Sequence, residues 1–267
     1  VPAEATWSIM PSNEGPKGRI HHSMVRVTHQ DGVSRIVLFA GQDFDGMALQ
    51  DMWTFHPEAN HDESKRWQRV TIVGPDVPKP RYGHAMTTTS RATLMVSGGL
   101  DASAVSIADL WEFSLSWDVD DIYSPKGQWA QRTPASSTVP DARAYHSLAS
   151  LNGADLLLFG GECNDRDIRN DLWHFDDVTS TWTEVMAPGS ANSERPAIRF
   201  QQNMVQIGPT ALMFGGLGQT GTGMAYNEIL WELITKGDET NLTARWRRVN
   251  ARGPSFRHTT TMVEMNG

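Results

Sequence analysis

The sequence has little cysteine, no long apolar run and no excess of positive charge. Its single cysteine, Cys163, cannot form an internal disulfide and fits a reducing compartment, so we expect a cytoplasmic protein. No apolar run reaches the roughly 18 residues of a transmembrane helix. With 23 basic and 31 acidic residues, the net charge of −8 argues against nucleic acid or an anionic membrane as a partner.

Catalytic signatures are missing as well. The sequence has no nucleophile elbow, no Walker phosphate loop and no His-Glu-x-x-His motif, so we expect no catalytic residues and no cofactor. The first residues lack an initiator Met and show neither a basic start nor an apolar core, so no signal peptide is visible. We therefore expect this chain to be part of a longer polypeptide.

Tryptophan, in contrast, is abundant and regularly spaced, with nine of the 10 residues in two registers roughly sixty positions apart. The first register is Trp53, Trp111, Trp173 and Trp231, and the second is Trp7, Trp67, Trp129, Trp182 and Trp246. Only Trp117 lies outside them, either as an exposed anchor for a partner or folded back over its own repeat. Self-similarity at a fixed period indicates that one supersecondary unit has been copied.

Each copy carries the same landmarks in the same order. It opens with Arg-x-x-His, at Arg19, Arg81, Arg143 and Arg199, although the fourth copy has Gln202 in place of histidine. An apolar run ending in glycine follows, and then an acidic-apolar-Trp element; in the third copy these are residues 156–161 and 171–173. Alternation of apolar and polar residues after each landmark predicts four short strands per copy.

Four-stranded sheets copied in series predict an all-β propeller. We expect one domain over residues 1–267, with complete blades at approximately 19–72, 81–133, 143–186 and 199–250. Single strands at 5–10 and 257–265 would belong to partial blades at the two ends.

The Arg-x-x-His element, the paired glycines, Asn-Asp-Leu-Trp at residues 170–173 and the second Trp together resemble kelch repeats. The resemblance covers nearly the whole chain, and its best copy is residues 143–186. The repeats resemble the non-BTB type found in the central propeller of galactose oxidase. The resemblance implies a ring of six or seven blades, of which this chain is a part, and a rim that binds protein partners. Cys163 lacks the evident companions that the copper site of galactose oxidase requires.

Two sets of loops are predicted to share one rim of the propeller, beside the mouth of its channel. Arg19, Arg81, Arg143 and Arg199 begin the innermost strands, where guanidiniums could hold acidic side chains of a partner or, alternatively, tie neighbouring blades together. Further candidate contacts are Asp43, Phe44 and Asp45 in the first loop and Glu162, Asp165, Arg166, Asp167 and Arg169 in the third. The charged residues of the third loop could equally be solvated surface.

The sequence therefore predicts a non-catalytic scaffold or adaptor that binds a loop or extended peptide of another protein, and not a small-molecule substrate. No metal site is expected, because equivalent histidines in different blades lie around a circle and need not converge. Three alternatives remain. The chain could be the targeting or regulatory propeller of a larger enzyme, a structural subunit of a large assembly such as a cytoskeletal complex, or a sugar-binding module.

Overall fold

The computed structural model describes residues 15–28, 32–57, 62–89, 93–118, 121–185, 195–220, 223–237 and 242–250. Within these ranges the chain forms 20 strands and two 3-10 turns, so the predicted all-β class is confirmed. No helix in the same ranges has the length and apolar character needed to cross a bilayer. The strands predicted at 5–10 and 257–265 lie outside the described residues.

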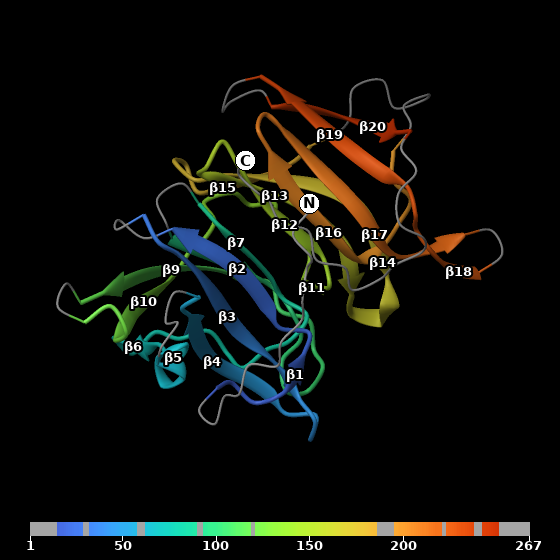
Figure 1. The fold of residues 1–267 in the computed structure, drawn as a ribbon. Coiled ribbons are helices and arrows are strands. Elements are labelled where there is room, and N and C mark those ends of the chain that lie inside the picture. Colours follow the sequence, from blue (N-terminus) through green and yellow to red (C-terminus); the bar gives the residue numbers. More distant parts are fainter. Residues whose placement is uncertain are drawn as a thin grey trace, which may run out of the picture.

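The strands form four separate sheets, which we call blades 1 to 4 in chain order (Figure 1). Blade 1 contains β1 (Arg19–Ile20), β2 (Ser23–Thr28), β3 (Ser34–Asp43), β4 (Ala48–Phe55) and β5 (Trp67–Arg69), with the 3-10 turn η1 (Glu63–Lys65) before β5. Blade 2 contains β6 (Thr71–Ile72), β7 (Ala85–Thr88), β8 (Thr93–Ser97), β9 (Leu110–Trp117) and β10 (Pro125–Gln131).

The other two blades repeat this plan. Blade 3 contains β11 (Arg143–Ala144), β12 (Ser147–Leu151), β13 (Asp155–Cys163), β14 (Ile168–Asp176) and β15 (Thr181–Glu184), with the 3-10 turn η2 (Asn164–Arg166) between β13 and β14. Blade 4 contains β16 (Phe200–Ile207), β17 (Thr210–Thr220), β18 (Gly223–Tyr226), β19 (Leu230–Lys236) and β20 (Thr243–Val249), with β18 paired to the end of β17.

The innermost strands β2, β7, β12 and β16 lie side by side around a common centre (Figure 1). Each apolar core fills the space between two successive blades. Phe39 of blade 1, for example, contacts Trp129 of blade 2 at 5.0 Å between ring centroids, and Phe159 of blade 3 contacts Trp246 of blade 4 at the same distance. The predicted propeller, with its indoles packed between radial sheets, is therefore confirmed with four blades.

One predicted boundary differs. Residues 71–72 were expected to end blade 1, but β6 pairs in parallel with β10 at the outer edge of blade 2. The Val73 N–H also donates to the carbonyl of Gly127 at 2.8 Å. The linker therefore crosses to the next blade before it turns inward, because the backbone groups at the edge of β10 offer it hydrogen bonds.

Candidate functional site

The arginines that open the first three blades are held inside their own blades. Arg81 donates from both terminal nitrogens to the carboxylate of Asp109, at 2.6 and 2.8 Å, and to the Gly98 carbonyl at 2.9 Å. Arg19 with Asp51 and Arg143 with Asp171 repeat this bidentate geometry. The side chains of Arg81 and Arg143 are 0% and 2% exposed, so their guanidiniums have almost no surface to offer a partner.

Each of these carboxylates also accepts a hydrogen bond from the first-register indole of its blade. In blade 3, Nε1 of Trp173 donates to Asp171 at 2.7 Å, and equivalent bonds join Trp53 to Asp51 and Trp111 to Asp109. Burial raises the pKa of Asp171, but the bonds from Arg143 and Trp173 and the charge of Arg143 outweigh it and hold this pKa below its usual value. We call each set the Arg–Asp–Trp triad.

Blade 4 lacks the carboxylate of this triad. Ile229 stands two residues before Trp231, where the other blades have aspartate, and the neighbouring Glu228 is exposed. Arg199 is 1% exposed and donates to the carbonyls of Ala197 and Gly215. Burial lowers the pKa of Arg199 to about 10. Among the described residues, Nε1 of Trp231 has no acceptor.

Partner binding by the four arginines stays a prediction, since no contact in the structure tests it. The alternative was that these arginines tie neighbouring blades together. They do so through the backbone only, because the carbonyls of Arg81, Arg143 and Arg199 each accept from a glycine N–H of the preceding blade, at 2.9 Å. Their guanidiniums, in contrast, form hydrogen bonds within their own blades.

The recurring histidines are buried between blades. Burial, followed by the charge of Arg143, lowers the pKa of His146 to about 3, and burial also lowers the pKa of His84 well below its usual value. Neither ring has a hydrogen-bond partner among the described residues. The described residues contain no group of three or more His, Cys, Asp or Glu placed to hold a metal ion.

The third residue of each Arg-x-x-His element forms the mouth of the channel. Gly83 N–H donates to the His21 carbonyl at 2.9 Å, Tyr145 to Gly83 at 2.7 Å, and Gln201 to Tyr145 at 2.8 Å. All four residues have positive φ, although only one of them is glycine. The rings of His21 and Tyr145 lie 5.1 Å apart in edge contact. The mouth is therefore lined by strained, partly aromatic residues that the sequence alone did not single out.

The loop between β3 and β4 presents the most exposed apolar side chain of the described residues. Asp43 shapes the loop, because its carboxylate accepts from the N–H groups of Asp45 and Met47 at 3.0 and 2.9 Å. Phe44 at its tip is 91% exposed. Its ring lies against the backbone of Gly18, where a Cβ would come within 2.7 Å of Cε2. Phe44 thus remains open to solvent on a loop whose backbone is ordered by Asp43.

The predicted residues of the third loop are arranged less uniformly. Arg169 bridges the exposed carboxylates of Asp141 and Asp167, at 3.0 and 2.9 Å. Asp165 and Arg166 lie in η2, and Arg166 is exposed. Glu162 is half-buried, and burial raises the pKa of its carboxyl group. Most of the charged side chains of this loop are therefore exposed, and partner binding by them stays a prediction.

Trp117, which is outside both registers, is half-buried rather than exposed. The guanidinium of Arg35 in blade 1 lies 4.8 Å from the centre of its ring. Trp117 therefore packs across to the neighbouring blade, which neither sequence-based expectation included.

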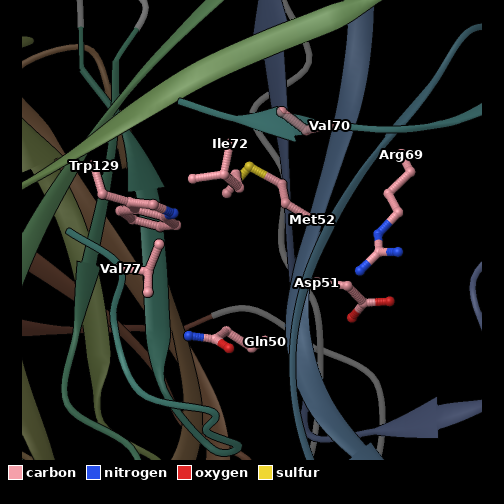
Figure 2. Close-up of a pocket in the computed structure, with 8 residues that line it drawn as sticks. All are labelled: Gln50, Asp51, Met52, Arg69, Val70, Ile72, Val77 and Trp129. Carbon is pink, nitrogen blue, oxygen red and sulfur yellow. The ribbon is translucent and has the colours of Figure 1, made fainter. Parts of the chain in front are cut away.

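A cavity of about 180 Å³ opens between blades 1 and 2 (Figure 2). Its apolar wall consists of Met52, Val70, Ile72, Val77 and Trp129. Three polar side chains complete it, namely Gln50, Asp51 and Arg69. Gln50 and Val77 belong to the two loop sets predicted to share a rim. No sequence pattern predicted the cavity itself, because its apolar wall combines side chains from β4, β6 and β10 with Val70 and Val77 of the linkers.

Radial five-stranded sheets, three of them closed by Arg–Asp–Trp triads and all four linked by backbone hydrogen bonds at the mouth, define a repeat β-propeller. The sequence matches the profile described as the KLHDC2/KLHL20/DRC7 Kelch-repeats domain over residues 2–216, and the chain belongs to the kelch-repeat family. The match ends within β17, and so the outer half of blade 4, which lacks the triad carboxylate, lies beyond it.

Curated relatives are longer and diverse. The chain is 28% identical to putative adagio-like protein 2 of Oryza sativa over 272 residues, covering 96% of this chain and 39% of that protein. It is 28% identical to human kelch domain-containing protein 3 over 218 residues, covering 76% and 50%. It is 32% identical to the flagellar outer-arm dynein alpha chain of Chlamydomonas reinhardtii over 169 residues, covering 62% and 3%. The chain thus spans at most half the length of these relatives.

Proposed function

We propose that this chain is a non-catalytic scaffold that binds a loop or extended segment of another protein at its rim and channel mouth. Kelch propellers generally serve as interaction modules rather than as enzymes, and this membership supports the proposal. The net charge of −8 favours a protein over nucleic acid as the partner. Cytoplasmic localisation stays a prediction.

The observation that carries the proposal is a patch of exposed apolar side chains on blade 1. Phe44, Met47 and Ile20 are 91%, 60% and 53% exposed. Ile20 faces Gln42 in the β1–β3 register, close to the loop that carries Phe44, so the three residues lie together. Aromatic and Met side chains held on a rigid loop are typical anchors of protein interfaces, because little ordering is needed on binding.

The mouth supports the same location. His21, Tyr145 and Gln201 adopt positive φ, at 55°, 57° and 58°, where a non-glycine residue is strained by about 1–3 kcal/mol. Strain of this kind tends to be kept where a side chain is needed for binding. These three residues point to the mouth as the second part of the interaction surface.

A photo-crosslinking amino acid at position 44 tests the proposal in extracts of the source cells. Val178 provides the matched control, because it is 77% exposed and lies in the turn after β14, at the opposite end of its blade. We expect one discrete protein adduct from position 44 and none from position 178. Equal, diffuse labelling from both positions would contradict a rim-binding function.

A structural subunit of a large assembly is the second candidate. The 32% identity to a flagellar outer-arm dynein chain supports it over a transient adaptor. Fixed stoichiometry of the crosslinked partner through gel filtration would favour the subunit, whereas dissociation on dilution would favour the adaptor. The relatives' greater length also keeps open a parent protein with further domains, such as an enzyme that this propeller targets.

A further inference from the structure

The cavity between blades 1 and 2 has walls that are already fixed in place. Met52 and Trp129 are 1% and 2% exposed and belong to the apolar core shared by the two blades. The ring of Trp129 is held by Phe113, at 4.6 Å between centroids, and by Phe39 on the other blade. Met52 and Trp129 therefore form a rigid floor with almost no surface of their own. The surface open to a ligand comes from half-buried Ile72 and from Val77, which is 40% exposed.

The remaining walls are tied to the same scaffold by hydrogen bonds. Ile72 lies in β6, whose parallel pairing to β10 sets Ile72 opposite Gly127. Gln50 Nε2 donates to the Pro78 carbonyl at 2.6 Å and so anchors the linker beside Val77. Figure 2 shows the side chains of Ile72, Met52 and Trp129 converging on this space.

The entrance to the cavity carries one positive charge that is not neutralised. The carboxylate of Asp51 is already engaged, since it accepts two bonds from Arg19, at 2.6 and 3.0 Å, and one from Trp53. The guanidinium of Arg69 extends toward the same carboxylate (Figure 2) but forms no hydrogen bond or ion pair within the part of the chain that the structure describes. Burial raises the pKa of Asp51, but the bonds from Arg19 and Trp53 and the charges of Arg19 and Arg69 outweigh it, so two cations act on one carboxylate. With Arg19 and Asp51 cancelling each other, exposed Arg69 leaves the entrance cationic.

Size and polarity together define the ligand. About 180 Å³ is below the roughly 300–1,000 Å³ of sites that enclose a small metabolite, so the cavity suits a single side chain. An apolar wall selects an aliphatic side chain, and a free guanidinium at the entrance selects a carboxylate that it can hold bidentately.

We propose that this cavity receives an aliphatic side chain, of Leu or Met size, from the partner protein, while Arg69 binds an Asp or Glu adjacent to it in the partner sequence. The proposal rests on the function proposed for the rim, and it specifies the partner chemistry there. The cationic contact in this proposal comes from Arg69 of β5, which is exposed, whereas the guanidiniums of Arg19, Arg81 and Arg143 are internal.

Blocked peptides provide the test. The probes are Ac-Ser-Leu-Glu-Ser-NH2 and Ac-Ser-Glu-Leu-Ser-NH2, each with versions in which Leu becomes Ala or Glu becomes Gln, titrated into the 267-residue chain and followed by NMR. We expect one of the two orders to bind, and either replacement to weaken it by about fivefold, the range of one partly exposed ion pair or one small apolar contact.

Two protein variants assign the binding to the cavity. Arg69→Gln should abolish the preference for Glu over Gln, whereas Arg26→Gln, the same charge change on an exposed arginine of β2, should leave the preference intact. Val77→Trp should block the peptide that binds, by filling the space; Val77 is 40% exposed, so this change leaves the buried core in place. Thermal unfolding of each variant checks its fold.

The outcomes separate the two proposals. If no peptide binds, or if Arg69→Gln and Val77→Trp bind as the parent chain does, the cavity proposal is wrong. The rim function survives that result when the crosslink from position 44 persists. If neither peptide binding nor the crosslink from position 44 is observed, the proposed rim function is wrong as well.

Discussion

Blades 3 and 4 have the same order of strands but differ in how they treat a buried charge. In blade 3 the guanidinium of Arg143 meets the carboxylate of Asp171 at 2.7 Å, and the indole of Trp173 donates to the same carboxylate. In blade 4 Arg199 and Trp231 are each 1% exposed, and Ile229 replaces the carboxylate. Packing of the indole therefore suffices to build a blade, and the ion pair is an addition to it.

This comparison also separates two effects of a buried ion pair. Forming one from solvated groups has a small net benefit, because desolvation offsets the attraction, whereas removing one partner leaves a buried charge uncompensated. Blade 4 shows that a lone guanidinium is tolerated when carbonyls solvate it, as those of Ala197 and Gly215 do. Arg143 has the equivalent carbonyl bonds, to Asp141 and Gly160, so in blade 3 the carboxylate of Asp171 adds to this solvation and does not replace it.

The largest effect is expected from Asp171→Ala. This change leaves Arg143 buried without its carboxylate and Trp173 without its acceptor, and should lower the free energy of unfolding by about 3–5 kcal/mol. Urea denaturation measures it. Asp141→Ala is the control, because Asp141 pairs only with partly exposed Arg169 and should lose no more than about 1 kcal/mol. Equal losses would mean that the triad is not what closes the blade.

Replacing the arginine itself should have different effects on stability in blade 3 and in blade 4. Arg143→Met strands the carboxylate of Asp171, whose side chain is 17% exposed, and should cost about 2–3 kcal/mol. Arg199→Met strands no carboxylate among the described residues and should change stability by no more than about 1 kcal/mol in either direction. Thermal or urea unfolding of the two variants measures both changes. A larger loss of stability for Arg199→Met than for Arg143→Met would contradict the comparison.

Acid should destabilise the blades through their histidines. The folded-state pKa of His146 is about 3, against 6.5 for an ordinary histidine, so between these values the unfolded chain binds a proton that the folded chain excludes. Its contribution is complete above pH 6.5 and is lost as pH falls, at about 1.4 kcal/mol per pH unit.

His146→Gln tests this slope with a residue that blade 4 already uses. Gln202 occupies the equivalent position and donates from Nε2 to the Phe159 carbonyl at 2.9 Å. Urea midpoints measured from pH 7 to pH 4 should fall less steeply in the variant than in the parent chain. Parallel curves would show that His146 is protonated in the folded state as readily as in the unfolded one.

The smallest effect is a gain. Ile229→Asp supplies the absent carboxylate to Arg199 and Trp231, and should raise stability by about 1 kcal/mol after the loss of a half-buried aliphatic group. Ile229→Asn is the matched control, since it has the same size without the charge and should be destabilising. If both variants are equally destabilised, the geometry of blade 4 does not reproduce the triad.

The period of the tryptophans and the alternation after each landmark were enough to predict the propeller, because both report directly on sheet faces. The triad was readable in part: aspartate two residues before Trp53, Trp111 and Trp173 recurs with the arginines, and its absence at Ile229 is visible in the sequence. Joining the two motifs required knowing that residues 28 positions apart meet, as Arg143 and Asp171 do.

Other features of the site have no local signal. Positive φ at His21 and Tyr145 occurs where backbone hydrogen bonds link successive blades, and only Gly83 marks that position with a glycine. The cavity beside Arg69 depends on the gap left among side chains from β4, β5, β6 and β10, which no spacing encodes.

The crossing of β6 to blade 2 has a practical consequence for engineering. The same crossing recurs one blade later, where the Ala135 N–H donates to the Ser180 carbonyl and Ser136 accepts from the Trp182 N–H. The boundaries of the sequence repeat are thus offset from the boundaries of the folded blade. A chimera joined after β6 would separate blade 2 from its outer edge strand. A junction placed before Thr71 would keep β6 and the rest of blade 2 together.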